Sequence, residues 1–303
     1  MKTLIIIIQS LLIIAISPLI SGIIRKIKNN LRMRKGPGIF QPYYNMFKLF
    51  HKEEVISENV SWIFHAAPFI VLSSTVAVLL LVPVIVPEWS LNFMGDFLLI
   101  IFLLGLGRFF LALAGLDTGS AFGGMGSSRE MFISSFVEPI VLIAVFAVAV
   151  KSGSTNMSSI SGIKMVYLSS VVAAVALFFV TIAETSRLPV DNQETHLELT
   201  MIHEAMVLEY SGRSLAMIEL ASHIKQIVFF TIITNILFPL GMLPDISPVM
   251  SIVIYILKIL GICVIISVIE VSIAKLRLFR VTDFLAFGFI LSFISMIVAV
   301  MGY

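Results

Sequence analysis

Residues 97–115 read FLLIIFLLGLGRFFLALAG, a stretch in which only Arg108 carries a charge. About 20 apolar residues in a helix cross a hydrocarbon core of about 30 Å, so this stretch predicts a transmembrane helix. Comparable apolar runs recur at 4–24, 64–86, 132–150, 163–183, 215–240, 249–274 and 284–302. The sequence therefore predicts an all-α integral membrane protein of about eight transmembrane helices, which form one transmembrane domain over residues 1–303.

The composition favours the same class of protein. Of 303 residues, 59% are hydrophobic and 13% are charged, against roughly a quarter charged in a soluble domain. A transmembrane β-barrel would show segments of about 10 residues with alternating polarity, and the sequence lacks them. The apolar run 4–24 follows Lys2, as the apolar core of a secretory signal peptide follows a basic residue. The run is too long for a signal peptide, however, and a basic segment rather than a mature domain follows it. We therefore expect it to remain as a helix.

The lysines and arginines predict how the chain is oriented. With the N-terminus outside, the inward loops hold fourteen of them and the outward side holds Lys2, Lys151 and Lys164. The fourteen are Arg25, Lys26, Lys28, Arg32, Arg34, Lys35, Lys48, Lys52, Arg129, Arg187, Arg213, Lys275, Arg277 and Arg280. Basic residues flank membrane helices mainly on the cytoplasmic side. We expect a multi-pass protein of the cell (cytoplasmic) membrane with both termini outside.

Two long inward segments carry most of the side chains capable of chemistry. In the first, residues 25–59, Tyr43, Met46, Phe47 and Phe50 recur at helical spacing after Pro42. This pattern predicts an amphipathic helix in the membrane interface. A solvated basic loop that holds the topology is the alternative.

The second inward segment, residues 184–213, is acidic. It holds Glu184, Asp191, Glu194, Glu198, Glu204 and Glu209 together with Arg187, His196 and His203. Carboxylates buried among helices can hold or release protons near neutral pH. A solvated acidic loop is the alternative interpretation.

Charged residues also occur inside the predicted spans. They are Arg108, Glu138, Glu219, Lys225, Lys258 and Glu270, with His223 one turn after Glu219. Because a charge facing lipid is costly, we expect them to face the bundle interior. Glu130 and Glu138 lie about two turns apart, so both are expected to look into one cavity. Two interpretations are open: the charged residues form static ion pairs that fix helix packing, or they are successive sites of a polar path across the membrane.

The chain offers no set of ligands for a metal cofactor. Its single cysteine, Cys263, lies within a predicted span, so no disulfide, zinc-thiolate or iron–sulfur site is expected from this chain alone. His203-Glu204 lacks the second histidine of a zinc-protease motif. The net charge of +2 arises from basic residues beside membrane spans, where anionic lipid explains them, and we expect no nucleic-acid partner.

Three motifs carry a resemblance to a known family. They are RKGP at 34–37 with QP at 41–42 and KL at 48–49, ETSRLPVD at 184–191 with Glu194 and Glu198, and EY at 209–210. Together they resemble the quinone-chamber membrane subunit of respiratory complex I. The short turn between residues 37 and 41 and the stretch 115–131 (GLDTGSAFGGMGSSREM) instead resemble the equivalent subunit of energy-converting [NiFe] hydrogenases, including formate hydrogenlyases. The membrane-bound sulfane reductase shares this anchor.

The resemblance implies an anchor and coupling subunit without a cofactor of its own. Its partners would be the large and small hydrogenase subunits, an iron–sulfur subunit and antiporter-like membrane subunits that move H⁺ or Na⁺, with the [NiFe] centre and iron–sulfur clusters in those partners. The family's acidic chamber maps onto Glu130, Glu138, Glu184, Asp191, Glu194, Glu198 and Glu209, with Arg187 as counter-charge. We add Arg108, Glu219 and Lys225 as further coupling residues and expect no catalytic residue.

Three rival interpretations stay open. The same anchor could serve a sulfane reductase, or the chain could line the quinone chamber of a NADH or ferredoxin:quinone oxidoreductase, although its short first turn argues against a quinone role. A stand-alone secondary transporter is the rival of another class. Such transporters are commonly built from paired repeats with broken helices, and this sequence displays no evident repeat.

Overall fold

The computed structural model describes residues 2–57, 60–84, 95–161, 167–191, 201–237 and 248–302. Within these ranges the chain is helical. The helices are α1 (Lys2–Leu31), α2 (Gln41–Phe50), α3 (Trp62–Leu81), α4 (Phe97–Asp117), α5 (Ala121–Ser152), α6 (Met157–Ser161), α7 (Leu168–Glu184), α8 (His203–Val207), α9 (Gly212–Leu237), α10 (Pro248–Ser272) and α11 (Leu278–Val300). A helix satisfies its own backbone hydrogen bonds, which a chain inside a bilayer requires.

Seven of these helices are long and apolar enough to cross a membrane, namely α1, α3, α4, α5, α9, α10 and α11. The remaining expected span corresponds to α7, which is apolar but shorter. The all-α membrane fold predicted from the sequence is thereby confirmed. The predicted amphipathic helix is present as α2, with Tyr44 and Phe47 exposed along it.

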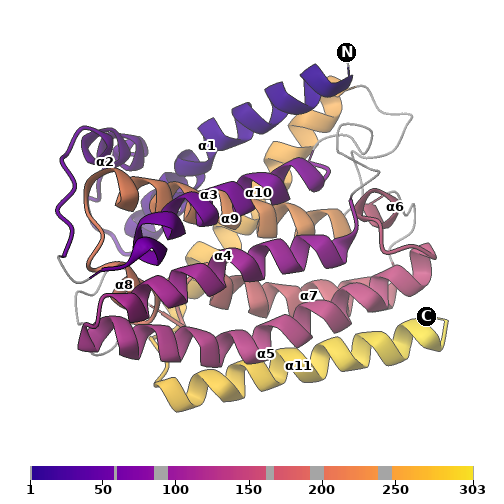
Figure 1. Cartoon of the computed structure of the whole chain (residues 1–303). Coiled ribbons are helices and arrows are strands. Elements are labelled where there is room, and N and C mark those ends of the chain that lie inside the picture. Colours follow the sequence, from indigo (N-terminus) through magenta and orange to yellow (C-terminus); the bar gives the residue numbers. More distant parts are fainter. Residues whose placement is uncertain are drawn as a thin grey trace.

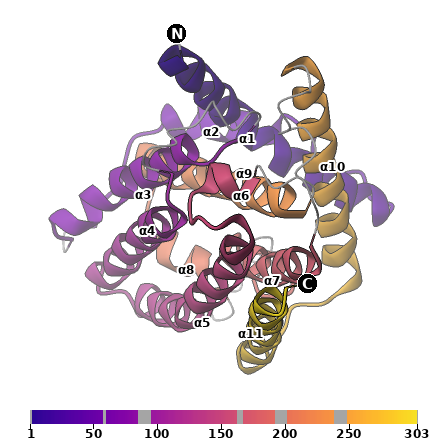
Figure 2. The same cartoon turned by 90° about the vertical axis from the view of Figure 1, so that its right-hand side faces the viewer.

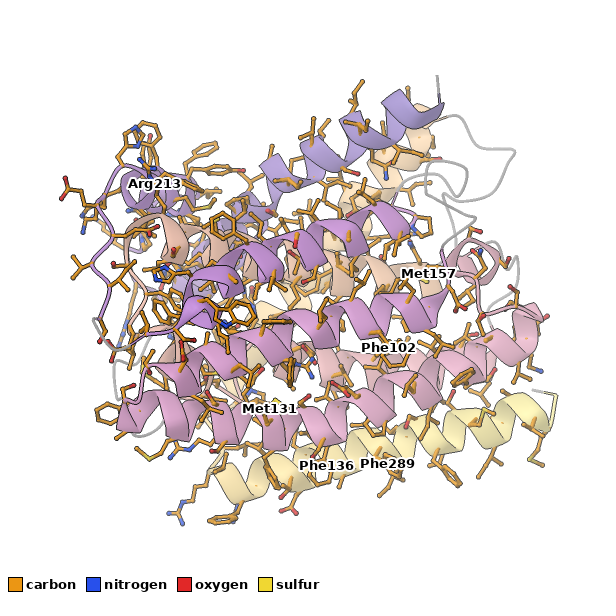
Figure 3. The ribbon with its side chains drawn as sticks, viewed as in Figure 1. Phe102, Met131, Phe136, Met157, Arg213 and Phe289 are labelled. Carbon is orange, nitrogen blue, oxygen red and sulfur yellow. The ribbon has the colours of Figure 1, made fainter. Side chains whose placement is uncertain are left out.

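The long helices form a bundle whose two ends differ (Figure 1). The short helices α2 and α8 lie at one end, and α6 lies at the other end together with both termini. Figure 3 places Arg213 at the α2 end and Met157 at the α6 end. Figure 2 looks along the bundle and shows α9 in the middle and α10 at the rim.

The start of α5 differs from the sequence prediction. We expected the third span to end at residue 115 and the fourth to begin at residue 132, which left residues 116–131 as a loop. Instead, α5 begins at Ala121 and only the turn 118–120 separates it from α4. Ser120 caps the new helix by accepting a hydrogen bond from the Gly123 amide. Gly119 in this turn has a positive φ of 62°, a conformation that glycine adopts without steric cost. Glu130, which precedes the predicted fourth span, therefore lies well inside a helix.

Glycines inside α5 allow close packing at this end of the bundle. A Cβ on Gly126 would lie 2.9 Å from the Ala205 Cβ and 3.1 Å from the Met206 amide nitrogen. Small residues at helix contacts let backbones approach closely in membrane proteins. The short helix α8 therefore packs directly onto α5.

Candidate functional site

The side chain of Arg108 is the centre of a buried ionic network. Arg108 lies on α4 with its side chain 7% exposed. One guanidinium nitrogen pairs with Glu184 at the end of α7, and the other lies 3.3 Å from the Glu138 carboxylate and 2.5 Å from the Ser134 hydroxyl. Its Nε lies 3.9 Å from Glu130 Oε1. One cation thus faces three carboxylates from two helices.

Lys225 on α9 extends this network across the bundle. Its ammonium lies 2.5 Å from the second carboxylate oxygen of Glu184. Glu184, with its side chain 3% exposed, therefore lies between two cations. Because a buried carboxylate is retained as an ion only when it is paired, the four helices α4, α5, α7 and α9 are tied together at this point.

A second ionic network lies around Glu270 near the end of α10. One oxygen of Glu270 lies 2.8 Å from Arg187, which follows α7, and the other lies 3.1 Å from Lys28 on α1. Arg187 also donates a 3.0 Å hydrogen bond to the side-chain amide oxygen Oε1 of Gln226 on α9. Here an anion faces two cations, the reverse of the arrangement around Arg108.

Polar side chains of α1 and α9 continue this second network. Ser21 donates a 2.9 Å hydrogen bond to Gln226 Oε1 and lies 2.8 Å from His223 Nδ1. Asp191 forms a separate contact, since it lies 2.7 Å from Lys275 and accepts hydrogen bonds from the amides of Ile202 and His203. Asp191 thus connects the stretch after α7 to the start of α8 and to the segment between α10 and α11.

The two networks border one cavity of about 110 Å³. Its lining includes Arg108, Glu130, Glu184 and Lys225 from the first network and Lys28, Arg187, Gln226 and Glu270 from the second, with Asp191 and His203. Among the described residues, buried Arg108 Nε, Arg187 Nε and Gln226 Nε2 have no hydrogen-bond acceptor. A cavity of this size and polarity suits several water molecules. Carboxylates, lysines, arginines and histidines thus line one polar space between the helices.

The structure brings part of the predicted site together. Arg108, Glu130, Glu138, Glu184 and Lys225 form the first network, and Arg187 and Asp191 line the same cavity. Glu138 contacts Arg108 but does not line the cavity, and its side chain is 46% exposed. The expected shared cavity thus contains Glu130 and not Glu138.

Other predicted site residues lie apart from the cavity. Glu209 is exposed, and Glu219 is half-buried on α9 without lining the cavity. Glu194 and Glu198, with His196, lie outside the described residues. Arg187, predicted as a counter-charge of the acidic chamber, pairs with Glu270. The coupling roles of all these residues stay predictions.

Sequence reasoning missed Lys28, Ser21 and Gln226 as members of the site. Lys28 belongs to a run of basic residues that the positive-inside pattern already explains, so it carried no separate signal. Ser21 and Gln226 are uncharged. Glu270 was noted only as a buried charge, and its two cationic partners are 242 and 83 residues away along the chain.

In the EY motif at 209–210, the tyrosine has a structural role. The Tyr210 ring stacks on Phe64 with centroids 4.0 Å apart, and its hydroxyl donates a 2.9 Å hydrogen bond to the Phe64 carbonyl. Burial, together with the negative charge of Asp117, raises the pKa of Tyr210 above its ordinary value of 10.0. Tyr210 therefore stays neutral and holds the start of α9 against α3, while Glu209 points to the surface.

Among the described residues, no group of three His, Cys, Asp or Glu side chains is arranged to hold a metal ion. A family model described as NADH dehydrogenase matches residues 2–301. The chain belongs to the NADH dehydrogenase family.

Relatives within this family include hydrogenase subunits. Hydrogenase-4 component C of Escherichia coli is 33% identical over 291 residues, covering 94% of this chain and 91% of that protein. Formate hydrogenlyase subunit 4 of the same organism is 32% identical, covering 96% of this chain and 98% of the relative. NADH-quinone oxidoreductase subunit 8 of Rhodothermus marinus is 28% identical over 71% of this chain.

A solved structure shares the fold over nearly the whole chain. It is a chain of the membrane-bound sulfane sulfur reductase, an archaeal respiratory membrane complex, with a TM-score of 0.86 over 98% of this chain and 99% of that one. The sequence identity is 20%. This similarity shows the fold, and the resemblance to hydrogenase-type and complex I-type membrane subunits rests on the sequence comparisons.

Proposed function

We propose that this chain is the membrane anchor and coupling subunit of a complex I-like, energy-converting hydrogenase. It docks a peripheral [NiFe] and iron–sulfur module and links the redox reaction of that module to movement of H⁺ or Na⁺ through neighbouring antiporter-like membrane subunits. The proposal makes the chain a non-catalytic part of an oxidoreductase complex. It also keeps the predicted orientation in the cell membrane, with both termini outside, and the single domain over residues 1–303.

The observation that carries this proposal is the buried double network around one polar cavity. Six ionic side chains from α1, α4, α7, α9 and α10 and the adjoining segment face one another there: Lys28, Arg108, Glu184, Arg187, Lys225 and Glu270. Charges at membrane depth are costly and mark ion or proton paths in many membrane proteins. A shift of one charge in such a cluster changes the electrostatic energy of the others because little solvent screens them.

The proposed mechanism uses this sensitivity. A redox event in the docked module would change the charge or position of the segment after α7, which carries Arg187 and Asp191. Arg187 contacts Glu270 and Gln226, and Glu184 immediately before that segment contacts Arg108 and Lys225. The disturbance would then reach both networks at once, and Glu138, which touches Arg108 while partly exposed, would pass it to a neighbouring subunit.

The identity of the docked module separates this proposal from its rivals. The two hydrogenase relatives match more than nine-tenths of the chain at above 30% identity, which favours a hydrogenase over a quinone oxidoreductase matched over 71% of the chain. The shared fold with the sulfane sulfur reductase complex supports that branch as the second candidate. A stand-alone transporter would need no redox partner.

The test is purification of the native complex through a tag on this chain. We expect nickel, iron and the hydrogenase subunits to copurify, and H₂ to evolve from reduced ferredoxin or formate without added quinone. Inhibitors of the complex I quinone site should leave this rate unchanged. Quinone reduction blocked by those inhibitors would overturn the hydrogenase assignment, and sulfane reduction without H₂ would move it to the sulfane reductase branch. Isolation of the chain alone would favour the transporter.

A further inference from the structure

Lys258 is a charged residue that the two networks do not use. It lies ten residues after the start of α10 at Pro248, which corresponds to about 15 Å along the helix at 1.5 Å per residue. Since the hydrocarbon core is about 30 Å thick, Lys258 lies near the middle of the membrane. It does not line the cavity, and no acidic side chain among the described residues lies within ion-pair distance of it.

A lysine in this position is costly unless something compensates its charge. A cation at the centre of a membrane helix is disfavoured by several kcal/mol even on insertion scales. Lysines near helix ends avoid this cost because their stems reach the interface. The four-carbon stem of Lys258 is far too short to span about 15 Å. The charge therefore needs a partner at the same depth.

The surface of α10 around Lys258 is open in this chain. In the apolar part of α10, 28% of the residues are buried, against 67% in the central helix α9. The helix lies at the rim of the bundle (Figure 2). With 3.6 residues per turn, the large exposed apolar side chains on the side of α10 next to Lys258 are Leu257, Ile265 and Val268. Lys258 itself is half-buried.

Helix α11 shows what distinguishes this face from a lipid-facing one. Its apolar part is also 28% buried, and Ile290 and Phe293 are exposed along it. Residues 284–300 contain no charged side chain. The exposed surface of α11 thus suits hydrocarbon, whereas the equally open surface of α10 carries a cation at mid-depth.

We propose that the face of α10 around Lys258 docks a transmembrane helix of a neighbouring membrane subunit whose Asp or Glu lies at the same depth and pairs with Lys258. The proposal rests on the proposed function insofar as that function supplies membrane partners. An anionic lipid headgroup cannot be the partner because it lies at the interface. A second copy of this chain bound through the same face by two-fold symmetry would bring like residues together, which would place two lysines against each other.

The first test uses photocrosslinking in the intact complex. A benzoylphenylalanine residue at Leu257, which is 62% exposed, samples the proposed interface. The same probe at Ile290 on α11, which is 54% exposed at similar depth, is the matched control. We expect a polypeptide adduct at position 257 with a membrane subunit that carries a mid-span Asp or Glu, and no polypeptide adduct at position 290. Lipid adducts alone at both positions, or an adduct with a second copy of this chain, would overturn the proposal.

The second test changes the charge. We expect Lys258→Glu to lower the amount of that membrane subunit retained on tagged complex by at least about tenfold, because two buried carboxylates would then face each other. Lys258→Arg should retain it at the wild-type level. A charge swap, in which the partner's Asp or Glu is replaced by Lys in the Lys258→Glu background, should restore retention of the partner subunit. Equal retention in Lys258→Glu and the wild type would contradict the proposal.

The nickel and iron content of the same preparations separates this inference from the proposed function. Loss of the membrane subunit with unchanged metal content in Lys258→Glu supports both. A crosslinked membrane subunit in a wild-type complex that lacks nickel overturns the hydrogenase assignment and leaves the α10 interface standing. A nickel-containing complex in which the probe at position 257 crosslinks only to lipid would overturn the proposed α10 interface and would leave the hydrogenase assignment intact.

Discussion

Removal of the charge of Glu270 should destabilise the chain strongly. The Glu270 side chain is 4% exposed and lies between Lys28 and Arg187, whose side chains are 7% and 12% exposed. The variant Glu270→Gln keeps the shape of the side chain but removes the negative charge that lies between the two buried cations. Removal of one partner from a buried ion pair costs about 3–5 kcal/mol. This corresponds to a fall in the unfolding midpoint of roughly 6 °C or more for a chain of this size.

The lone cysteine provides the assay. Cys263 is fully buried on α10 and is the single cysteine of the chain. A thiol-reactive fluorophore added to purified chain in mild detergent should therefore react only when the bundle opens. We expect Glu270→Gln to react at a clearly lower temperature than the wild type. The exposed-surface variant Glu53→Gln is the matched control and should react at the wild-type temperature.

A triple variant tests the physical reasoning behind this magnitude. In Lys28→Met with Arg187→Met and Glu270→Met, the three charges that face one another around Glu270 are removed together. Replacement of a buried ion triad by apolar residues of similar volume is often neutral or stabilising, so the triple variant should recover most of the lost stability. The reasoning is refuted if Glu270→Gln unfolds at the wild-type midpoint, or if the triple variant is less stable than Glu270→Gln.

Three shorter predictions concern packing and topology. Gly126→Ala should lower the unfolding midpoint because its Cβ would press on α8, whereas Gly124→Ala, with nothing within 4 Å, should leave it unchanged or higher; equal midpoints would contradict the close packing. Tyr210→Phe should lower the free energy of unfolding by about 1 kcal/mol because one hydrogen bond is missing. The raised pKa keeps Tyr210 neutral in the folded chain, so the wild type should lose stability as the pH rises above about 10, the ordinary pKa of tyrosine in the unfolded chain. Tyr210→Phe should lose less stability over the same rise in pH. Ser154→Cys should react with an impermeant thiol reagent outside intact cells and Lys52→Cys should not, and the reverse pattern would invert the orientation.

The membrane fold could be predicted from the sequence because a bilayer imposes one strong rule. Apolar runs of span length, broken by basic segments, leave few alternatives to a helical bundle. The amphipathic pattern after Pro42 likewise depends only on local spacing, and α2 forms there. Local patterns of this kind were sufficient wherever a single helix faces a uniform environment.

The start of α5 could not be predicted because tertiary contacts override local preference. Residues 119–128 are rich in Gly and Ser, which usually favour a turn or loop. In the folded chain the small size of Gly123 and Gly126 allows α5 to pack closely on α4 and α8. The same residues that weaken a helix in isolation thus permit it here.

The partners of the buried charges also could not be predicted from the sequence. Buried charges were expected to find partners, but which ones depends on how helices far apart in the chain meet. Arg187 was expected as a counter-charge of the acidic chamber, and the carboxylate that it contacts among the described residues is Glu270, 83 residues away. Lys28 could not be told from the other basic residues of its segment until α1 was placed against α10.

The central claim, that the buried network couples redox chemistry to ion movement, is tested most directly by the number of ions moved per H₂ evolved. Purified complex reconstituted in sealed vesicles is compared with Glu130→Gln and Glu184→Gln complexes, with Glu53→Gln as the surface control. Glu130→Gln is the milder change, since its carboxylate lies 3.9 Å from Arg108. The account predicts wild-type H₂ evolution in detergent for both network variants, with ion transport per H₂ strongly reduced in vesicles and unaffected in Glu53→Gln. Wild-type ion transport per H₂ in assembled Glu130→Gln and Glu184→Gln complexes would contradict it.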